Sequence, residues 1–189
     1  DTGARLTTRL PRDADAYVDS DGQWVAGATG IWNVETGTRV ADARCPRCVF
    51  SPDRSTLFSS VGPALWNART WQKVADLTGH AGNIRTARYS HNAAFLVTSA
   101  RDDSVALVWD ASTGERTAAL PHDAPVSDAS FSAGDDLIVT ACEDGIARIW
   151  EASTGRLLRE LDVPAGAIHT VAFSADDAFL ATASSGGEA

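Results

Sequence analysis

Apolar residues in this chain occur in short runs separated by turn-forming residues, with no helical periodicity. In the clearest unit, residues 126–131 have spaced apolar positions and residues 137–141 form a β-branched run. The turn at 143–145 contains an Asp-Gly pair, which favours a tight hairpin. Residues 146–150 then alternate, and residues 157–161 close the unit. The pattern predicts four short antiparallel strands in about 42 residues, which is one blade of a β-propeller.

The same unit recurs along the chain at a nearly constant spacing of about 40 residues. A tryptophan marks the third predicted strand of each unit, and a Thr-Gly turn follows three of the four tryptophans. An aromatic-Ser pair closes the first predicted strand, and a weaker copy lies at Val18-Asp19. These landmarks are Trp32, Trp66, Trp109 and Trp150, and Phe50-Ser51, Tyr89-Ser90, Phe131-Ser132 and Phe173-Ser174. Because the landmarks keep one phase, they predict a repeat fold.

The repeat resembles the WD40 family in its period, its Thr-Gly turns, the Gly79-His80 pair, and Asp144-Gly145 followed by Ile149-Trp150. The resemblance implies an all-β propeller and a buried hydrogen-bonded tetrad of His, Ser/Thr, Asp and Trp in each regular blade. The tetrads it implies are His80, Thr98, Asp103 and Trp109 in the third blade, and His122, Thr140, Asp144 and Trp150 in the fourth. The second blade departs from the pattern because it lacks the His and the Asp and has Trp71 in place of the turn glycine.

We expect residues 1–189 to form a single propeller segment of about four to five blades. A family ring of about seven blades needs some 280 residues, so the segment is expected to be part of a larger ring. It is therefore expected to self-associate or to assemble with missing blades. The expected units are a strand of a preceding blade at 1–10, blades at about 11–44, 45–80, 81–122 and 123–164, and a partial blade at 165–189.

Charge and composition narrow the function. The chain has 16 basic and 25 acidic residues, a net charge of −9, which disfavours binding to nucleic acid or to an anionic membrane. No apolar run approaches the roughly 18 residues of a membrane span. A single lysine among many arginines and alanines indicates a bacterial sequence, and three cysteines without a glycosylation motif favour the cytoplasm. The start at Asp1 and the lack of methionine indicate a processed or truncated end.

Candidate chemistry is explained by the repeat. Cys45 and Cys48 resemble a redox or zinc motif, but they occupy apolar slots filled by Ile84 and Ala87 in the next copy, and no second ligand pair accompanies them. We interpret them, and Cys142, as thiols that pack as small hydrophobes. The histidines and the Ser/Asp pairs follow the tetrads and turns. The sequence therefore predicts no catalytic residue, metal or cofactor.

The remaining candidates are polar residues in the loops before the first strands and in the hairpins between second and third strands. Arginine is favoured at interfaces, so Arg85 and Arg101 are the strongest candidates for contact with a partner. The alternative is that these loop residues are only solvated. We predict a non-catalytic scaffold that binds protein partners within a larger regulatory or signalling protein. The alternatives are a propeller enzyme with a metal-dependent hydrolytic site in its channel, and a structural segment that completes a ring. The candidate contact residues are Asn83, Arg85, Arg101, Asp102, Asp123 and Glu143.

Overall fold

The structure is a computed structural model that describes residues 17–18, 23–27, 30–43, 48–164 and 166–186. Every regular element in these ranges is a β-strand, which confirms the all-β prediction. Among the described residues there is no helix long and apolar enough to cross a membrane. The strand predicted at residues 1–10 lies outside these ranges.

The strands form four four-stranded antiparallel sheets followed by a two-stranded sheet. We call them blades 1 to 5. Each strand pairs with its neighbours in sequence, so each blade is a meander, which is the arrangement of a propeller blade. The strands are β1 (Tyr17–Val18), β2 (Trp24–Gly27), β3 (Gly30–Asn33) and β4 (Arg39–Ala41) in blade 1; β5 (Cys48–Phe50), β6 (Thr56–Ser59), β7 (Ala64–Asn67) and β8 (Lys73–Asp76) in blade 2; β9 (Ile84–Tyr89), β10 (Phe95–Ala100), β11 (Val105–Asp110) and β12 (Arg116–Pro121) in blade 3; β13 (Val126–Phe131), β14 (Leu137–Cys142), β15 (Ile146–Glu151) and β16 (Leu157–Asp162) in blade 4; and β17 (Ile168–Phe173) and β18 (Leu180–Ser184) in blade 5.

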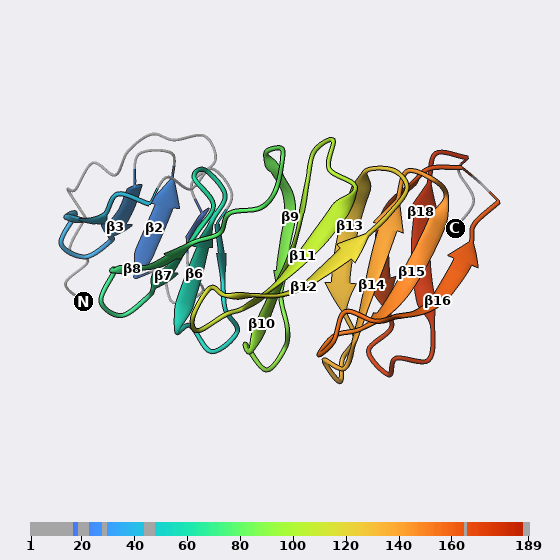
Figure 1. Ribbon diagram of the computed structural model, residues 1–189. Helices are drawn as coiled ribbons and strands as arrows, with labels where there is room; N and C mark the ends of the chain where they lie inside the picture. The colour runs from blue at the N-terminus through green and yellow to red at the C-terminus, as the bar shows by residue number, and fades with distance from the viewer. Residues whose placement is uncertain (1–16, 19–22, 28–29, 44–47, 165, 187–189) are drawn as a thin grey trace, which may run out of the picture.

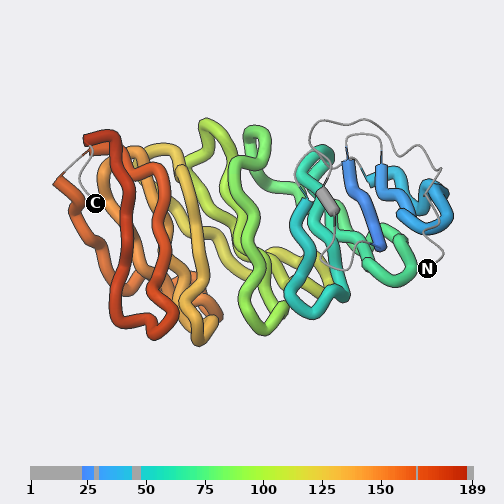
Figure 2. Tube along the Cα trace, turned by 180° about the vertical axis from the view of Figure 1, so that it is seen from behind, coloured from blue at the N-terminus to red at the C-terminus, as the bar shows by residue number. Residues whose placement is uncertain are grey.

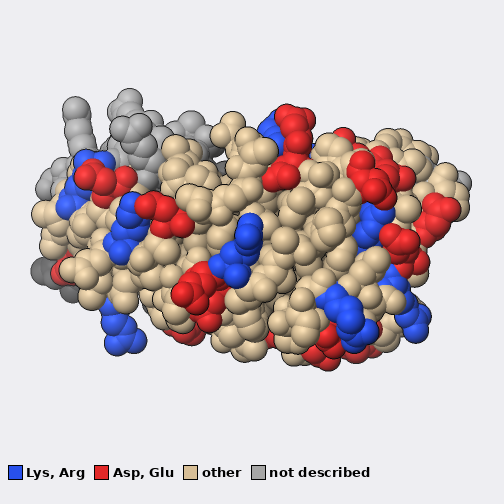
Figure 3. Space-filling model, viewed as in Figure 1, with Lys and Arg blue, Asp and Glu red and all other residues tan. Residues whose placement is uncertain are grey.

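The blades stand side by side in a row, with blades 1 and 5 at opposite ends (Figure 1). The first strands of blades 2 to 5 adjoin one another along one side of the row, which is the side seen in Figure 2. The fourth strands of blades 2 to 4 lie on the other side, which is turned to the viewer in Figure 1. Basic and acidic side chains are interspersed on that side (Figure 3).

The apolar core lies between blades, because each blade has two apolar faces and cannot bury both alone. Phe58 and Leu65 of blade 2 pack against Leu96, Leu107 and Trp109 of blade 3. The next interface is built in the same way, with Val97 and Leu120 of blade 3 against Ile138 and Trp150 of blade 4. The sequence period is therefore the period of the inter-blade contacts.

The Thr-Gly turns lock neighbouring blades together. Gly155, in blade 4, has a φ of +70°, and a Cβ added to it would lie 2.7 Å from the Cβ of Ala118 in blade 3. Gly114 has a φ of +74° and lies in the same way against Ala75 of blade 2. The glycine is thus required twice, for its left-handed backbone and for close approach to the blade before it.

Replacing Gly155 with alanine should cost about 2–4 kcal/mol of unfolding free energy, because the new methyl group adds overpacking to the backbone strain. Gly62 provides the matched control, since its φ is +60° but a Cβ there would meet nothing within 4 Å. Its alanine variant should cost only about 1–2 kcal/mol. Urea unfolding of both variants measures the difference, and equal losses would contradict the packing role of Gly155.

Trp71 takes the place of the turn glycine in blade 2 and keeps the same left-handed backbone, with a φ of 57°. It is buried against blade 1, where its ring makes an edge contact with Trp24 at a centroid distance of 4.9 Å. The space exists because Ala43 occupies the position at which blade 3 has the larger Leu120. The interface between blades 1 and 2 is therefore filled by one large ring where the others use a glycine and a leucine.

Two aspartates fasten the first turns of successive blades. Asp135 has a left-handed φ of 63°, and its two carboxylate oxygens accept the backbone N–H groups of residues 91–92, each at 2.7 Å. Asp177 repeats the contact one blade later, accepting the N–H groups of residues 133–134 at 2.7 and 3.0 Å. Each of these two turn aspartates therefore joins two neighbouring blades.

Cys48 is buried in the apolar cluster between blades 1 and 2, as its slot in the repeat predicts. It is disulfide-bonded, however, so the prediction of a free thiol at this position is wrong. Cys45 lies outside the described residues. Cys142 is a buried free thiol, and burial raises its pKa, which makes it unreactive as expected of a packing residue.

Candidate functional site

The candidate contact residues lie at one end of blades 3 and 4. In an antiparallel meander the loop before the first strand and the hairpin between the second and third strands share an end. We call this end of the two blades the loop face. It comprises residues 79–85 and 101–104 of blade 3, and residues 122–125 and 143–145 of blade 4, so it includes the first two residues of β9.

Asn83, Arg101 and Asp102 form the blade 3 part of the loop face, and all three are exposed. The backbone N–H of Arg101 donates to the carbonyl of Asn83 at 2.8 Å, so the two loops lie against each other. This hairpin has one residue more than its equivalent in blade 4, and Asp102 accommodates it with a left-handed φ of 58°. The structure therefore brings these three predicted residues together on a fixed backbone.

Arg85 and Glu143 connect the two blades at the loop face. Nη1 of Arg85, on β9, lies 2.9 Å from Oε1 of Glu143, in the β14–β15 hairpin. Both side chains are partly exposed. Asp123 is almost fully exposed, at 93%, and its carboxylate reaches to 3.5 Å from Arg148 Nη2. The six candidate residues thus share one surface that mixes both charge signs.

The blade 3 tetrad is present as the family resemblance implied. Nε1 of Trp109 donates to Oγ1 of Thr98 at 2.8 Å, and that hydroxyl lies 2.8 Å from Nε2 of His80. Nδ1 of His80 lies 2.7 Å from Oδ2 of Asp103. A proton on Nδ1 lets the chain run in one direction from indole to hydroxyl to imidazole to carboxylate. The imidazole of His80 is 3% exposed and both of its nitrogens are hydrogen-bonded, so it stabilises the blade.

The tetrad predicted for blade 4 is wrong at Asp144. Trp150 and His122 both bond to Thr140, at 2.9 and 2.7 Å, but Nδ1 of His122 donates to the carbonyl of Leu120 at 2.9 Å. The carboxylate of Asp144 instead accepts Nη1 of Arg148 at 2.7 Å. Arg148 stands where blade 3 has a leucine, so this blade contains a cation that draws the carboxylate away from the histidine.

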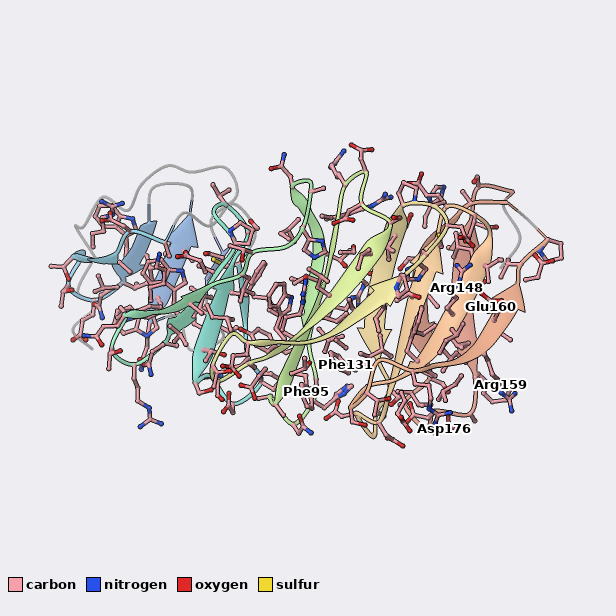
Figure 4. The ribbon with its side chains drawn as sticks, in the orientation of Figure 1. Phe95, Phe131, Arg148, Arg159, Glu160 and Asp176 are labelled. Atoms are coloured by element: carbon pink, nitrogen blue, oxygen red, sulfur yellow. The ribbon has the colours of Figure 1, made fainter. Side chains whose placement is uncertain are left out.

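Arg148 is buried, with a side chain 4% exposed, and is surrounded by carboxylates. Besides Asp144, Glu160 of β16 accepts its Nε at 2.8 Å, and the two residues lie side by side in Figure 4. Burial alone would raise the pKa of Asp144, but hydrogen bonds from Arg148 and the Ile146 amide outweigh it, so the pKa is lowered. The cluster is therefore a satisfied internal ion pair, which explains why Arg148 can be buried.

Burial and the charge of Arg148 lower the pKa of His122 to about 4. The unfolded chain, with a histidine pKa near 6.5, binds the proton more readily, so stability is lost as the pH falls from about 6.5 toward 4. We expect the parent to lose roughly 2 kcal/mol more than His122→Gln between pH 7 and pH 4.5. Urea unfolding at both pH values tests this, and equal losses in the two proteins would contradict it.

The N-terminal blades keep only parts of the tetrad. In blade 2, Ser59 accepts Nε1 of Trp66 at 3.1 Å, so a serine hydroxyl holds the indole without a histidine. In blade 1, Nε1 of Trp32 is buried and no described residue accepts its proton. Among the residues that the structure describes, blades 1 and 2 therefore have fewer buried hydrogen bonds at the tetrad position than blades 3 and 4, in line with the tetrad residues missing from the sequence of blade 2.

Asp128, which sequence analysis did not single out, holds three blades together. It lies on β13 and is 3% exposed. Nη2 of Arg88, from blade 3, donates to both carboxylate oxygens at 3.0 and 3.1 Å. From blade 5, Oγ1 of Thr170 donates at 2.6 Å and the N–H of Val171 at 3.3 Å. The available signal was an acidic residue in an apolar first strand, at the slot of Thr86 and Thr170.

No group of three or more His, Cys, Asp or Glu side chains in the described part of the chain is placed to hold a metal ion. The buried histidines bond to threonine hydroxyls, and the buried carboxylates bond to arginine, histidine or backbone groups. What this end of the blades presents to solvent is a fixed set of polar loop side chains.

Comparison with protein families finds a repeat family whose model matches three successive segments of the chain. The model of the WD domain, G-beta repeat, matches residues 71–110, 114–151 and 155–188, more than half of the chain. Each match begins in the turn before the last strand of one blade and continues into the next blade, so the matched units are offset from the sheets. A search among curated proteins finds no match.

Proposed function

Because the chain belongs to the WD40-repeat family, whose repeats generally mediate protein–protein interaction, we propose that it is a non-catalytic module that binds a protein partner through the loop face. The observation that carries the proposal is that six polar side chains lie at the same end of blades 3 and 4, in hairpins, in loops before first strands and at the start of β9. Hairpins on a rigid sheet present side chains at little entropic cost on binding. The finer proposal of a role in a larger regulatory or signalling protein rests on the family resemblance, and that of a bacterial cytoplasmic protein rests on composition. The disulfide at Cys48 weighs against the cytoplasm.

Arg101 and Asp102 are the centre of the proposed surface. They are exposed and adjacent, and they carry opposite charges. Arg85 and Glu143 form a partly exposed ion pair in the same loop face. Charge pairs of this kind favour a partner with the complementary arrangement and reject others, which suits specific recognition.

The non-catalytic part of the proposal is supported by how the ionisable groups are used. A hydrolytic site needs a base or a metal with lone pairs available to substrate. His80 is buried between Thr98 and Asp103, and His122 is held by Thr140 and a backbone carbonyl. Both histidines therefore stabilise the blades. The loop face is suited to binding.

Site-specific photo-cross-linking tests the loop face. A photoreactive amino acid placed at Arg101 in the full chain, in its own cells, should yield a discrete cross-linked protein. The same group at Ala133, exposed at the opposite end of blade 4, should not. Reversing the charge of Asp102 should abolish the adduct formed from position 101. A partner that cross-links from position 133 alone would overturn the proposal.

We also propose that blades 4 and 5 take part in assembly, with further blades or with a second copy. Leu161 is 38% exposed on β16, whereas its equivalent Leu120 in blade 3 is fully buried by the next blade. Phe179 is 74% exposed, whereas its equivalent Phe95 packs on the cluster that contains Phe131 (Figure 4). Exposed apolar groups of this size favour association. Sedimentation should show oligomers that dissociate in Leu161→Ser, and a stable monomer at high concentration would contradict this proposal.

A further inference from the structure

An apolar groove lies between the first strands of blades 2 and 3. It has a volume of about 380 Å³, and its walls include Val49 of β5, Phe58 of β6, and Ile84 and Ala87 of β9. The first strands adjoin on the side of the row seen in Figure 2. A volume of this size accommodates one or two apolar side chains.

The groove exists because the polar bridge of the next interfaces is missing here. Between blades 3 and 4, Arg88 reaches across to Asp128. Between blades 2 and 3 the equivalent positions are Val49 and Thr86, and Oγ1 of Thr86 bonds within its own blade to Ser99 at 3.1 Å. Among the described residues no charged pair fills the space, so the interface stays open and apolar.

Two arginines, Arg85 and Arg88, line the groove, and its lining includes no acidic residue. The side chain of Arg88 is 46% exposed, and its recorded bonds to Asp128 use only Nη2. A guanidinium has five N–H donors, so a second carboxylate can bind beside the first. The groove therefore combines an apolar floor with two guanidinium groups at its rim, where Arg85 is paired with Glu143 and Arg88 with Asp128.

The groove continues along β9 as a second hollow of about 310 Å³, which shares Val49, Ala87 and Arg88 with the first and adds the aromatic side chains of Tyr89 and Phe131. Strand β9 has six residues, and a strand of that length spans about 20 Å. The combined hollow therefore has the form of a channel beside a strand, which suits an extended peptide better than a compact ligand.

We propose that this groove binds an extended peptide segment in which an aliphatic or aromatic side chain is followed by Asp or Glu. The apolar side chain lies against Val49 and Ile84, and the carboxylate binds Arg88. The inference rests on the proposed protein-binding function and adds the chemistry of the partner. Arg85 also forms part of the loop face, so one partner can contact both surfaces.

Methyl NMR of the full chain, labelled at isoleucine, tests the groove. The probes are six capped hexapeptides with Leu, Ile or Phe at the third position and Glu or Gln at the fourth. Glu peptides should shift the Ile84 methyl signal and leave buried Ile138 unmoved. The matched Gln peptides should bind about tenfold more weakly, because the charged hydrogen bond to Arg88 is lost.

Two variants separate binding from folding. Val49→Gln narrows the groove and Arg88→Gln removes the cation, and each should reduce the Ile84 shift at least fivefold while the Ile138 signal shows that the fold is kept. Equal binding of Glu and Gln peptides, or no Ile84 shift with any of the six, would overturn the groove proposal. The cross-linking from position 101 is independent: an adduct there without an Ile84 shift refutes the groove alone, and loss of both refutes the proposed function.

Discussion

Replacing Asp128 with alanine is expected to lower the free energy of unfolding by about 3–4 kcal/mol, the largest effect that we predict for a single substitution. The change removes the carboxylate that receives Arg88 from blade 3 and Thr170 from blade 5. It also leaves the N–H of Val171, in a buried backbone segment, without its acceptor. Because three blades share this one group, its loss weakens two interfaces at once.

Asp123→Ala is the matched control for Asp128→Ala. Asp123 is also an acid near an arginine, but its side chain is 93% exposed and its contact with Arg148 is 3.5 Å long. Its loss should cost less than about 0.5 kcal/mol. Urea unfolding of the two variants decides the point, and a loss below 1 kcal/mol for Asp128→Ala would show that the three-blade bridge contributes little.

Thr98→Val is expected to cost about 2–4 kcal/mol although valine has nearly the same shape as threonine. The hydroxyl accepts the indole proton of Trp109 and bonds to Nε2 of His80, and all three side chains are buried. Valine leaves two buried polar atoms without a partner, and their desolvation is then uncompensated.

Thr182→Val places the same change at the equivalent position of blade 5, where Thr182 is half-exposed and lies in a two-stranded sheet. We expect a loss below about 0.5 kcal/mol, because no buried indole depends on this hydroxyl. Thermal unfolding of both variants compares them directly. Similar losses would indicate that the cost arises from strand packing and not from the tetrad.

The blades could be predicted from sequence because their determinants are local. Residues 137–141 and 146–150 give alternating or β-branched runs, and the Asp144-Gly145 turn joins them. The structure places β14 at Leu137–Cys142 and β15 at Ile146–Glu151, so those strands are confirmed to within one residue. Repetition of the pattern also identified the loops that share one end, which is why the candidate residues lie together.

The partners of individual charges could not be predicted, because they depend on competition between groups that meet only in the fold. Asp144 was expected to bond to His122, but Arg148 lies closer to it and carries a full charge. Arg85 pairs with Glu143 across two blades, and nothing in either local sequence specifies the pair. Asp128 is similar, since its role depends on hydrogen-bond donors from both neighbouring blades.

The oxidised state of Cys48 was missed for a different reason. Its apolar slot in the repeat predicted burial correctly, and burial of a cysteine is compatible with a thiol or a disulfide. The periodic pattern indicates which positions face the core, and it carries no information about covalent bonds.

Hydrogen–deuterium exchange of the chain, alone and with the protein that cross-links from position 101, tests the central claim most directly. Binding through the loop face predicts slower exchange at residues 79–85, 101–104, 122–125 and 143–145. The first turns at the other end, residues 51–55, 90–94, 132–136 and 174–178, should be unchanged. Protection confined to those first turns, with none at the loop face, would contradict the account.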